Sequence, residues 1–475
     1  MTLRILLVLS LSAAPALAQP AARPAPKQAP KPTPAAPAQP PAPDDMVAFE
    51  HDLDALFSTG GLTADQAASR ATGASPTVRR RAAEIEAAIA QTESAELARV
   101  PVLSGKASYT RLSHVDPPMI PGFDSVFPVI ENSYLFEAQL VVPLSDYLLR
   151  YPQLIDAARL GVDAARIGKR TSEVGAGQDA RLAYYEWVRA RLQVLIAQRQ
   201  RIQVARTLDQ VRALAEAQRL SKADLMRVES QDADAEQVVA QLENLSQLRE
   251  EQLRLLIGAP AGEPLAIGED IRGAITAPAA GSLDDLMTTA KRQRLEFRSI
   301  DTGIAAKDSQ RAAEKANVLP RLSAFAVADY ADPNQRIFPA KDEFKLTWSV
   351  GAQITWALPD ALQSRATDHR IRAEADELRA DRESLERGTR IEVLAAQQAV
   401  SLAQHSLDTT QKGLAAAEEG YRVRKELLNA ERATAVELVD AETELTRSRI
   451  AALNARVDLR VARAQLDHAL GNDAK

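Results

Sequence analysis

Apolar residues recur at alternating steps of three and four along the end of the chain. The series is Leu438, Ala441, Leu445, Ser448, Ala452, Ala455, Leu459, Ala462, Leu466 and Ala469. This spacing is typical of a coiled-coil seam, and most of its side chains are small. A similar series runs from Leu225 to Leu256. The pattern predicts two long helices that approach their neighbours closely and end at Gly258 and Gly471, where left-handed C-caps are expected.

Strict alternation of apolar and polar residues marks two hairpins. It is clearest over residues 344–356 and recurs over 134–142, whereas the expected partner strands, 103–109 and 322–330, alternate less cleanly. On pattern alone, an ordinary half-buried sheet is the alternative. The length suits a tilted membrane strand of about 9 to 11 residues. We therefore expect a lipid-facing side made of Tyr134, Phe136, Leu140, Phe344, Leu346, Trp348, Val350, Ile354 and Trp356.

These patterns occur twice in the same order, which indicates an internal duplication. Residues 62–101 align without a gap on 281–320, and residues 214–258 align on 427–471. A duplicated unit usually cannot bury its apolar surface alone. We expect a first repeat over 46–260 (hairpin at about 101–144, long helices at about 152–257), an inter-repeat linker over 261–281, and a second repeat over 282–475 (hairpin at about 320–358, long helices at about 360–471).

The long helical regions must each fold back once. Pro152 suits the first turn of one long helix, and Asp360 is the expected N-cap of the other. If the chain reverses near 219–222 and near 431–434, each long arm has roughly 65 to 70 residues and spans about 100 Å. Each return arm spans about 55 Å. The expected fold is therefore mainly α, with a palisade of long helices and a small β part.

The N-terminus predicts export. Arg4, the apolar run 5–11 and the small-residue sequence at 16–18 form an expected signal peptide over residues 1–18. Residues 19–45 are rich in Pro and Ala, a composition typical of a flexible, solvated segment. The chain has no cysteine, which excludes disulfides, thiolate metal sites and an acylated N-terminal cysteine. We expect an exported protein without a lipid anchor.

Composition argues against nucleic-acid binding and catalysis. The 58 basic and 64 acidic residues are interleaved and leave a net charge of -6, so no nucleic-acid-binding patch is indicated. The five histidines are scattered, and neither a zinc-binding helix pair nor a glycine-rich phosphate loop occurs. We expect no enzymatic activity, no cofactor and no metal.

Strand number predicts the assembly. Four strands leave open edges, lipid tolerates no unpaired backbone, and closed membrane barrels begin at about eight strands. A single chain therefore cannot form the barrel. Three chains would supply twelve strands, so a homotrimer is expected.

Several local sequences resemble the TolC-like outer-membrane efflux proteins, from about residue 50 to the C-terminus. They are LTADQA (62–67) before SP (75–76), LPRLS (319–323), VPLSD (142–146), LPD (358–360) and ELVDAE (437–442). The resemblance implies a trimeric channel-tunnel in the outer membrane of a Gram-negative bacterium, with a twelve-stranded β-barrel on a twelve-helix periplasmic α-barrel. It also implies passive passage of efflux or type I secretion substrates, with a periplasmic adaptor and an inner-membrane pump as partners.

The resemblance also assigns functional residues at the helical tips. Its acidic entrance positions correspond to Glu437 and Asp440, with Asp224 in the first repeat, and Arg432 is adjacent to Ala433, where the family has its gate arginine. Threefold rings of carboxylates would attract cations. The adaptor-docking tips correspond to Ala217, Gln218, Arg219, Ala430, Glu431 and Arg432, which replace the family's usual Val-Gly-Leu or Val-Gly-Thr motif.

A second class of protein shares part of this pattern. A periplasmic coiled-coil adaptor or scaffold would have the same signal peptide and long helices, but it would not need amphipathic strands of membrane length. The strands therefore favour the channel.

Overall fold

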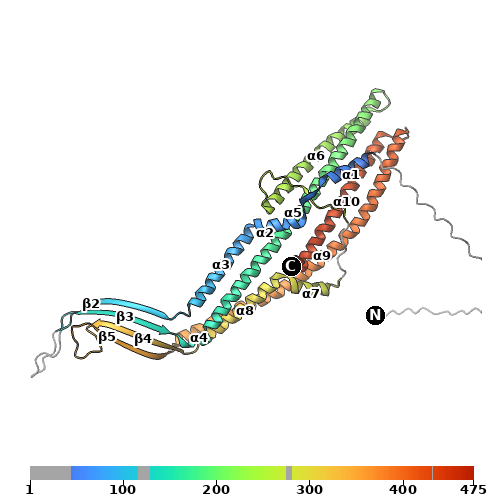
Figure 1. Ribbon diagram of the computed structural model, residues 1–475. Coiled ribbons are helices and arrows are strands. Elements are labelled where there is room, and N and C mark those ends of the chain that lie inside the picture. The colour runs from blue at the N-terminus through green and yellow to red at the C-terminus, as the bar shows by residue number, and fades with distance from the viewer. Residues whose placement is uncertain (1–43, 116–128, 274–280, 431, 475) are drawn as a thin grey trace, which may run out of the picture.

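A computed structural model describes residues 44–115, 129–273, 281–430 and 432–474. The expected signal peptide and nearly all of the Pro/Ala-rich segment lie outside these residues. The molecule is elongated, with a β-sheet at one end and the turns of two helical hairpins at the other (Figure 1). None of the helices in the described part of the chain has an apolar stretch of membrane-spanning length.

The sheet joins the two repeats. Its four strands are β2 (Val102–Arg111), β3 (Asn132–Val142), β4 (Arg321–Asp332) and β5 (Lys345–Thr355). They are antiparallel in the order β2-β3-β4-β5, so β3 of the first hairpin pairs with β4 of the second. β2 and β5 are the two edge strands. The predicted hairpins are confirmed, and the pairing between them could not be read from either hairpin alone.

Residues opposite each other on neighbouring strands share a face of the sheet, and the register separates the two faces by polarity. One row holds Ala107, Phe136, Tyr330 and Leu346, and the next holds Gly105, Ala138, Ala328 and Trp348. This face is apolar across all four strands. Lys106, Glu137, Asp329 and Thr347 form a row on the other face. One side of the sheet is therefore continuously apolar, whereas the other side is mixed and carries the charged residues together with apolar residues such as Phe325 and Val327.

Two helical hairpins form the other half of the molecule. α5 (Tyr151–Glu216) folds back into α6 (Lys222–Ile257), and α9 (Leu358–Asn429) folds back into α10 (Ala435–Leu470). α5 has 66 residues and α9 has 72, which is about 100 Å at 1.5 Å per residue. α10 packs between α9 and α5, and α6 packs on the other side of α5. Near the sheet, the helices that pack against α5 are α3 (Pro76–Leu97) and α8 (Leu295–Ala316).

The helix ends agree with the sequence at most positions. Ser75 caps α3 with Pro76 in the first turn, and Gly258 and Gly471 end α6 and α10 at φ 65° and 73°. The prediction for Asp360 was wrong: α9 begins two residues earlier, with Ala357 as its N-cap. Pro359 fits the first turn because that turn needs no backbone N–H, which leaves Asp360 inside the helix beside the positive end of its dipole.

Three further elements have no counterpart in the sequence analysis. α4 (Leu144–Leu149) links the sheet to α5, and α1 (Asp44–Leu56) with β1 (Phe57–Leu62) precedes the short helix α2 (Ala64–Ala74). The second repeat has α7 (Leu283–Gln293) at the position of α2.

The linker between the repeats packs against the helices. Ile267 and Ile271 are only 1% and 2% exposed, in a core shared by α2, α5, α6 and α10.

Candidate channel entrance and membrane-facing surface

The apolar face of the sheet is exposed along its whole length. Trp348 and Ile354 on β5 are 71% and 72% exposed, and the seven other residues predicted to face lipid are exposed as well. All nine lie on this face or directly continue it at the ends of β5. Soluble monomers rarely expose a contiguous apolar surface of this kind, so it indicates an interaction with an apolar partner.

The opposite face of the sheet suits contact with water. Glu137 lies directly opposite Asp329, with Lys106 on the outer side of Glu137. Two like charges directly opposite each other destabilise a sheet unless solvent or a cation screens them. The row beside them contains Ser104, Gln139 and Ser349, with Val327 as its one apolar member. This side of the sheet therefore has the chemistry of a water-filled lumen.

At the end of the molecule far from the sheet, equivalent backbone hydrogen bonds close the turns of the two helical hairpins. The N–H of Arg219 donates to the carbonyl of Leu214 at 2.9 Å, and the N–H of Arg432 donates to the carbonyl of Leu427 at 2.8 Å. The predicted docking residues Ala217, Gln218, Arg219, Ala430 and Arg432 are all exposed in these turns. Gln218 has φ 57°, a left-handed conformation that is uncommon without glycine. Glu431, the remaining predicted docking residue, lies outside the described residues.

Two of the predicted entrance acids interact with the N-cap residue of their helix. The backbone N–H of Thr434 donates to the Glu437 carboxylate at 3.0 Å, and Thr434 Oγ1 accepts from the Glu437 N–H, which completes a capping box at the start of α10. In the first repeat, Ser221 Oγ donates to Asp224 at 2.6 Å and accepts from the Asp224 N–H. Glu437 and Asp224 thus have a structural role in addition to any role at an entrance.

Asp440 connects the two repeats. Arg227 Nη2, on α6, lies 3.4 Å from Asp440 Oδ1, and both side chains are more than half exposed. The predicted gate residue Arg432 lies in the turn before α10, and the arginine that pairs with Asp440 is Arg227. Arg227 is not among the site residues predicted from the sequence, although the sequence contains a signal for it. In the alignment of 214–258 on 427–471, Arg227 falls on Asp440, so equivalent positions of the repeats carry opposite charges.

Below this ion pair, the hairpins meet through a narrow apolar seam. Leu208 and Val211 of α5, Val228 of α6, and Ala435 and Val439 of α10 form one buried cluster. One turn further along α10, Thr207 Oγ1 donates to the buried carboxylate of Glu442 at 3.3 Å. Separation of the two hairpins at the tip would have to expose this cluster.

Both Glu437 and Asp440 also line a groove between α9 and α10, of about 440 Å³. Its α9 wall contains the small residues Gly413, Ala416, Ala417 and Gly420, together with Tyr421 and Arg424. Small side chains leave room for another helix to approach the backbone closely.

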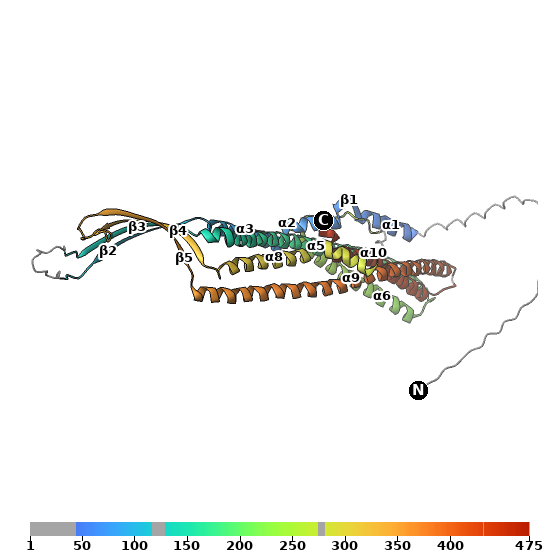
Figure 2. The ribbon, with the colours of Figure 1, turned by 90° about the horizontal axis from the view of Figure 1, so that it is seen from below.

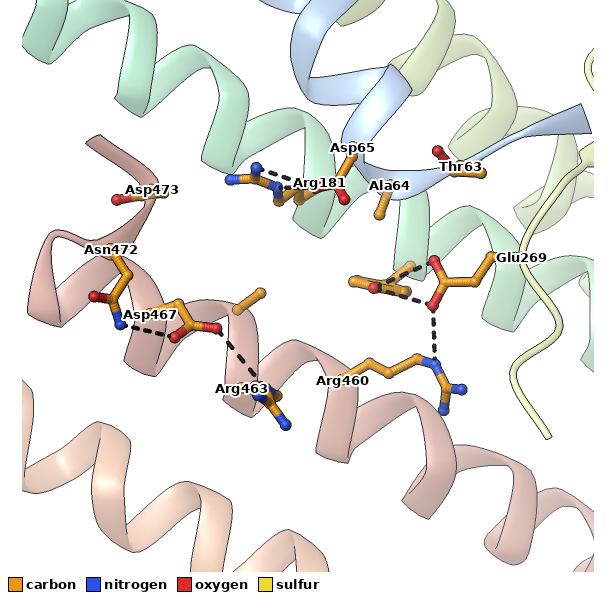
Figure 3. Close-up of a pocket in the computed structure, with 12 residues that line it drawn as sticks. Thr63, Ala64, Asp65, Arg181, Glu269, Arg460, Arg463, Asp467, Asn472 and Asp473 are labelled. Atoms are coloured by element: carbon orange, nitrogen blue, oxygen red, sulfur yellow. Dashed lines mark hydrogen bonds and ion pairs between the residues drawn. The ribbon is translucent and has the colours of Figure 1, made fainter. Parts of the chain in front are cut away.

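A second cavity, of about 770 Å³, lies where α2, α5, α10 and the linker meet (Figure 3). Arg460 Nε donates to Glu269 at 3.2 Å, and the Tyr185 hydroxyl donates to the same carboxylate at 3.4 Å. Burial raises the pKa of Tyr185 well above its ordinary value, so the phenol stays neutral. These groups satisfy one another, which is typical of a structural ion-pair network. The residues that the structure describes include no cluster of three potential metal-binding side chains.

Comparison with known proteins agrees with this arrangement. Residues 286–472 match the family model of the outer membrane efflux proteins. No curated protein matches the chain by sequence. The solved structure of CusC, described as forming a transmembrane channel, is 17% identical, with a TM-score of 0.73 over 88% of this chain and 93% of that one.

Two further solved structures share the fold. The outer membrane protein VceC from Vibrio cholerae is 16% identical, with a TM-score of 0.70 over 86% of this chain and 96% of that one. The MtrE outer membrane channel from Neisseria gonorrhoeae, in its open state, is 18% identical, with a TM-score of 0.70 over 87% and 89%. The second repeat thus matches the family of the outer membrane efflux proteins, and both repeats share the fold of these solved outer-membrane proteins.

Proposed function

We propose that this protein is the outer-membrane channel of a tripartite efflux or type I secretion system. In this function, substrates delivered by an inner-membrane pump and a periplasmic adaptor pass through it without further energy input. The observation that carries the proposal is the four-stranded sheet, which has one exposed apolar face and two unpaired edges. Lipid can cover the apolar face, but it cannot satisfy the edges.

The edges support a homotrimer. Pairing of β5 with β2 of a neighbouring copy satisfies both edge strands, and three copies give a twelve-stranded barrel. The outermost helices, α6 and α9, also expose large apolar side chains such as Leu255, Ile391 and Leu402. We assign these side chains to the same contact between copies, which closes a helical barrel below the sheet. The polar face with Glu137 and Asp329 then lines the lumen.

The helical tips would form the periplasmic entrance. Threefold repetition of Asp440 and Glu437 places carboxylates around that opening, and rings of negative charge favour cations over anions. The Arg227–Asp440 pair and the apolar seam beside it hold the two hairpins of a protomer together. We propose that these contacts keep the entrance narrow when no adaptor is bound.

The adaptor would dock at the same end. Its helices can lie in the groove between α9 and α10, where small residues allow close approach and the acidic wall of Glu437, Asp440 and Glu444 favours basic partner residues. The exposed turn residues around 217–219 and 430–432 would contact the tip of an adaptor hairpin. The pump, rather than this chain, would select among drugs, metal ions and polypeptides.

Membrane fractionation and bilayer recording test the proposal. The channel requires that the protein be extracted from the outer membrane with detergent as a trimer and conduct ions in a planar bilayer. A periplasmic adaptor or scaffold would instead appear in the soluble periplasmic fraction as a protein without pore activity, and that result would overturn the proposal.

A further inference from the structure

The N-terminal helix α1 lies across both repeats. It packs on one side of the helical layer, with β1, away from α6 and α9 (Figure 2). Leu53 and Leu56 contact the buried core cluster that contains Trp187 of α5 and Val457 of α10. α1 is therefore attached to the two helices whose seam joins the repeats.

Ion pairs fix α1 to the first repeat and to the linker. Asp52 accepts a hydrogen bond from the guanidinium of Arg199 on α5. Arg272 of the linker reaches Glu50 at 3.2 Å and Asp54 at 2.7 Å. Guanidinium-carboxylate hydrogen bonds are among the stronger polar contacts in proteins. One side of α1 is thus held by residues of α5 and of the linker.

A cation–π contact fixes α1 to the second repeat. The guanidinium carbon of Arg449, on α10, lies 4.5 Å from the ring centroid of Phe49. Arg449 is only 7% exposed, and such contacts are stronger when water is excluded. Burial raises the pKa of Glu418 on α9, and the nearby guanidinium of Arg449 opposes this shift. The negative charge of Glu50 raises the same pKa further, so α1 also acts electrostatically on α9.

These attachments lie close to the tip. Arg199 is about 26 Å before the end of α5, and Arg449 is about 21 Å after the start of α10, at 1.5 Å per residue. If α9 and α10 swing away from α5 and α6, α1 cannot follow both. It must lose either the Phe49–Arg449 contact or the Asp52–Arg199 pair.

We propose that α1 is a strap that ties α5 to α10 on the outside of the helical layer and biases the entrance towards its closed form. This inference rests on the proposed channel function. It assigns regulation of the entrance to a segment remote from the lumen, in addition to the contacts at the tip.

Bilayer recording of the full-length trimer tests the strap. The variant Phe49→Ala with Asp52→Asn removes one contact to each repeat. Contacts of these types typically shift an equilibrium by roughly twofold to fivefold each, so we expect the open probability or mean conductance to rise roughly fivefold. Ala55→Gln, at an exposed position of the same helix, is the matched control and should behave as wild type.

The possible results distinguish the channel function from the role of α1 as a strap. A wild-type protein that forms no pore overturns the channel function itself. A wild-type pore with an unchanged double variant overturns only the strap. If the double variant does not assemble as a trimer, Asp52→Asn alone decides, because it removes the ion pair to α5 and leaves the Phe49–Arg449 contact in place. A raised open probability in that variant supports the strap, and an unchanged one overturns it.

Discussion

A single charge on β5 should distinguish a membrane barrel from a water-exposed sheet. Val350 is 71% exposed midway along β5 on the apolar face, and its neighbour Ser349 lies on the opposite face. An arginine on the lipid face of a barrel costs about 2 to 4 kcal/mol at the midplane, or about 6 to 12 kcal/mol for three copies. An arginine in a water-filled lumen should cost little. Val350→Arg should therefore prevent stable insertion, whereas Ser349→Arg should be tolerated.

The assay compares the two variants directly. Detergent-extracted trimer and folding into liposomes would be measured for Val350→Arg, Ser349→Arg and the wild type. Because the two positions are adjacent on one strand, they have the same local backbone and differ mainly in the face that they occupy. If both variants insert equally well, or if only Ser349→Arg fails, the assignment of the two faces is refuted.

Three other substitutions test separate contacts. Arg227→Ala should raise the open probability by roughly 1.4-fold to fivefold, since an exposed ion pair contributes about 0.2 to 1 kcal/mol. The exchange Arg227→Asp with Asp440→Arg should restore the wild-type value in bilayers, and failure of the exchange would contradict pairing. The Asp473 carboxylate raises the pKa of His468 above its ordinary value, so the resulting stability is fully present below that ordinary value and is lost as pH rises through the raised pKa. His468→Gln should lower the thermal stability of the trimer at about pH 6 but hardly at about pH 9, and an equal loss at both would refute this role. Gly471→Ala should destabilise the protein by at least about 1 kcal/mol in denaturant titration, because φ is 73° and the added Cβ would lie 2.9 Å from a neighbouring backbone nitrogen; unchanged stability would contradict this.

For the acidic residues at the tip, resemblance to a family does not predict which contacts each side chain makes. The resemblance gives Glu437 and Asp440 the same expected role at the entrance, yet their contacts differ. Glu437 closes a capping box with Thr434, whereas Asp440 reaches across to Arg227. The capping role could be read from the Thr-x-x-Glu spacing, because it is local. The ion pair could not, because it depends on how α6 and α10 are placed beside each other.

The local and periodic features of this protein can be read from its residues alone. Heptad spacing, strict alternation and the gapless repeat predicted the long helices, the hairpins and the duplication, because each depends on residues close in the chain. The ends of α6 and α10 followed from glycine for the same reason. Even the two faces of the sheet were contained in the alternation.

Contacts between segments far apart in the chain become visible only in the three-dimensional fold. The linker reads as a connector, but Ile267 and Ile271 are buried in the core. α1 follows a segment without core-forming pattern, yet it joins α5 to α10 through Phe49 and Asp52. Such contacts depend on the relative position of elements far apart in sequence, and one chain contains no periodic signal for that position.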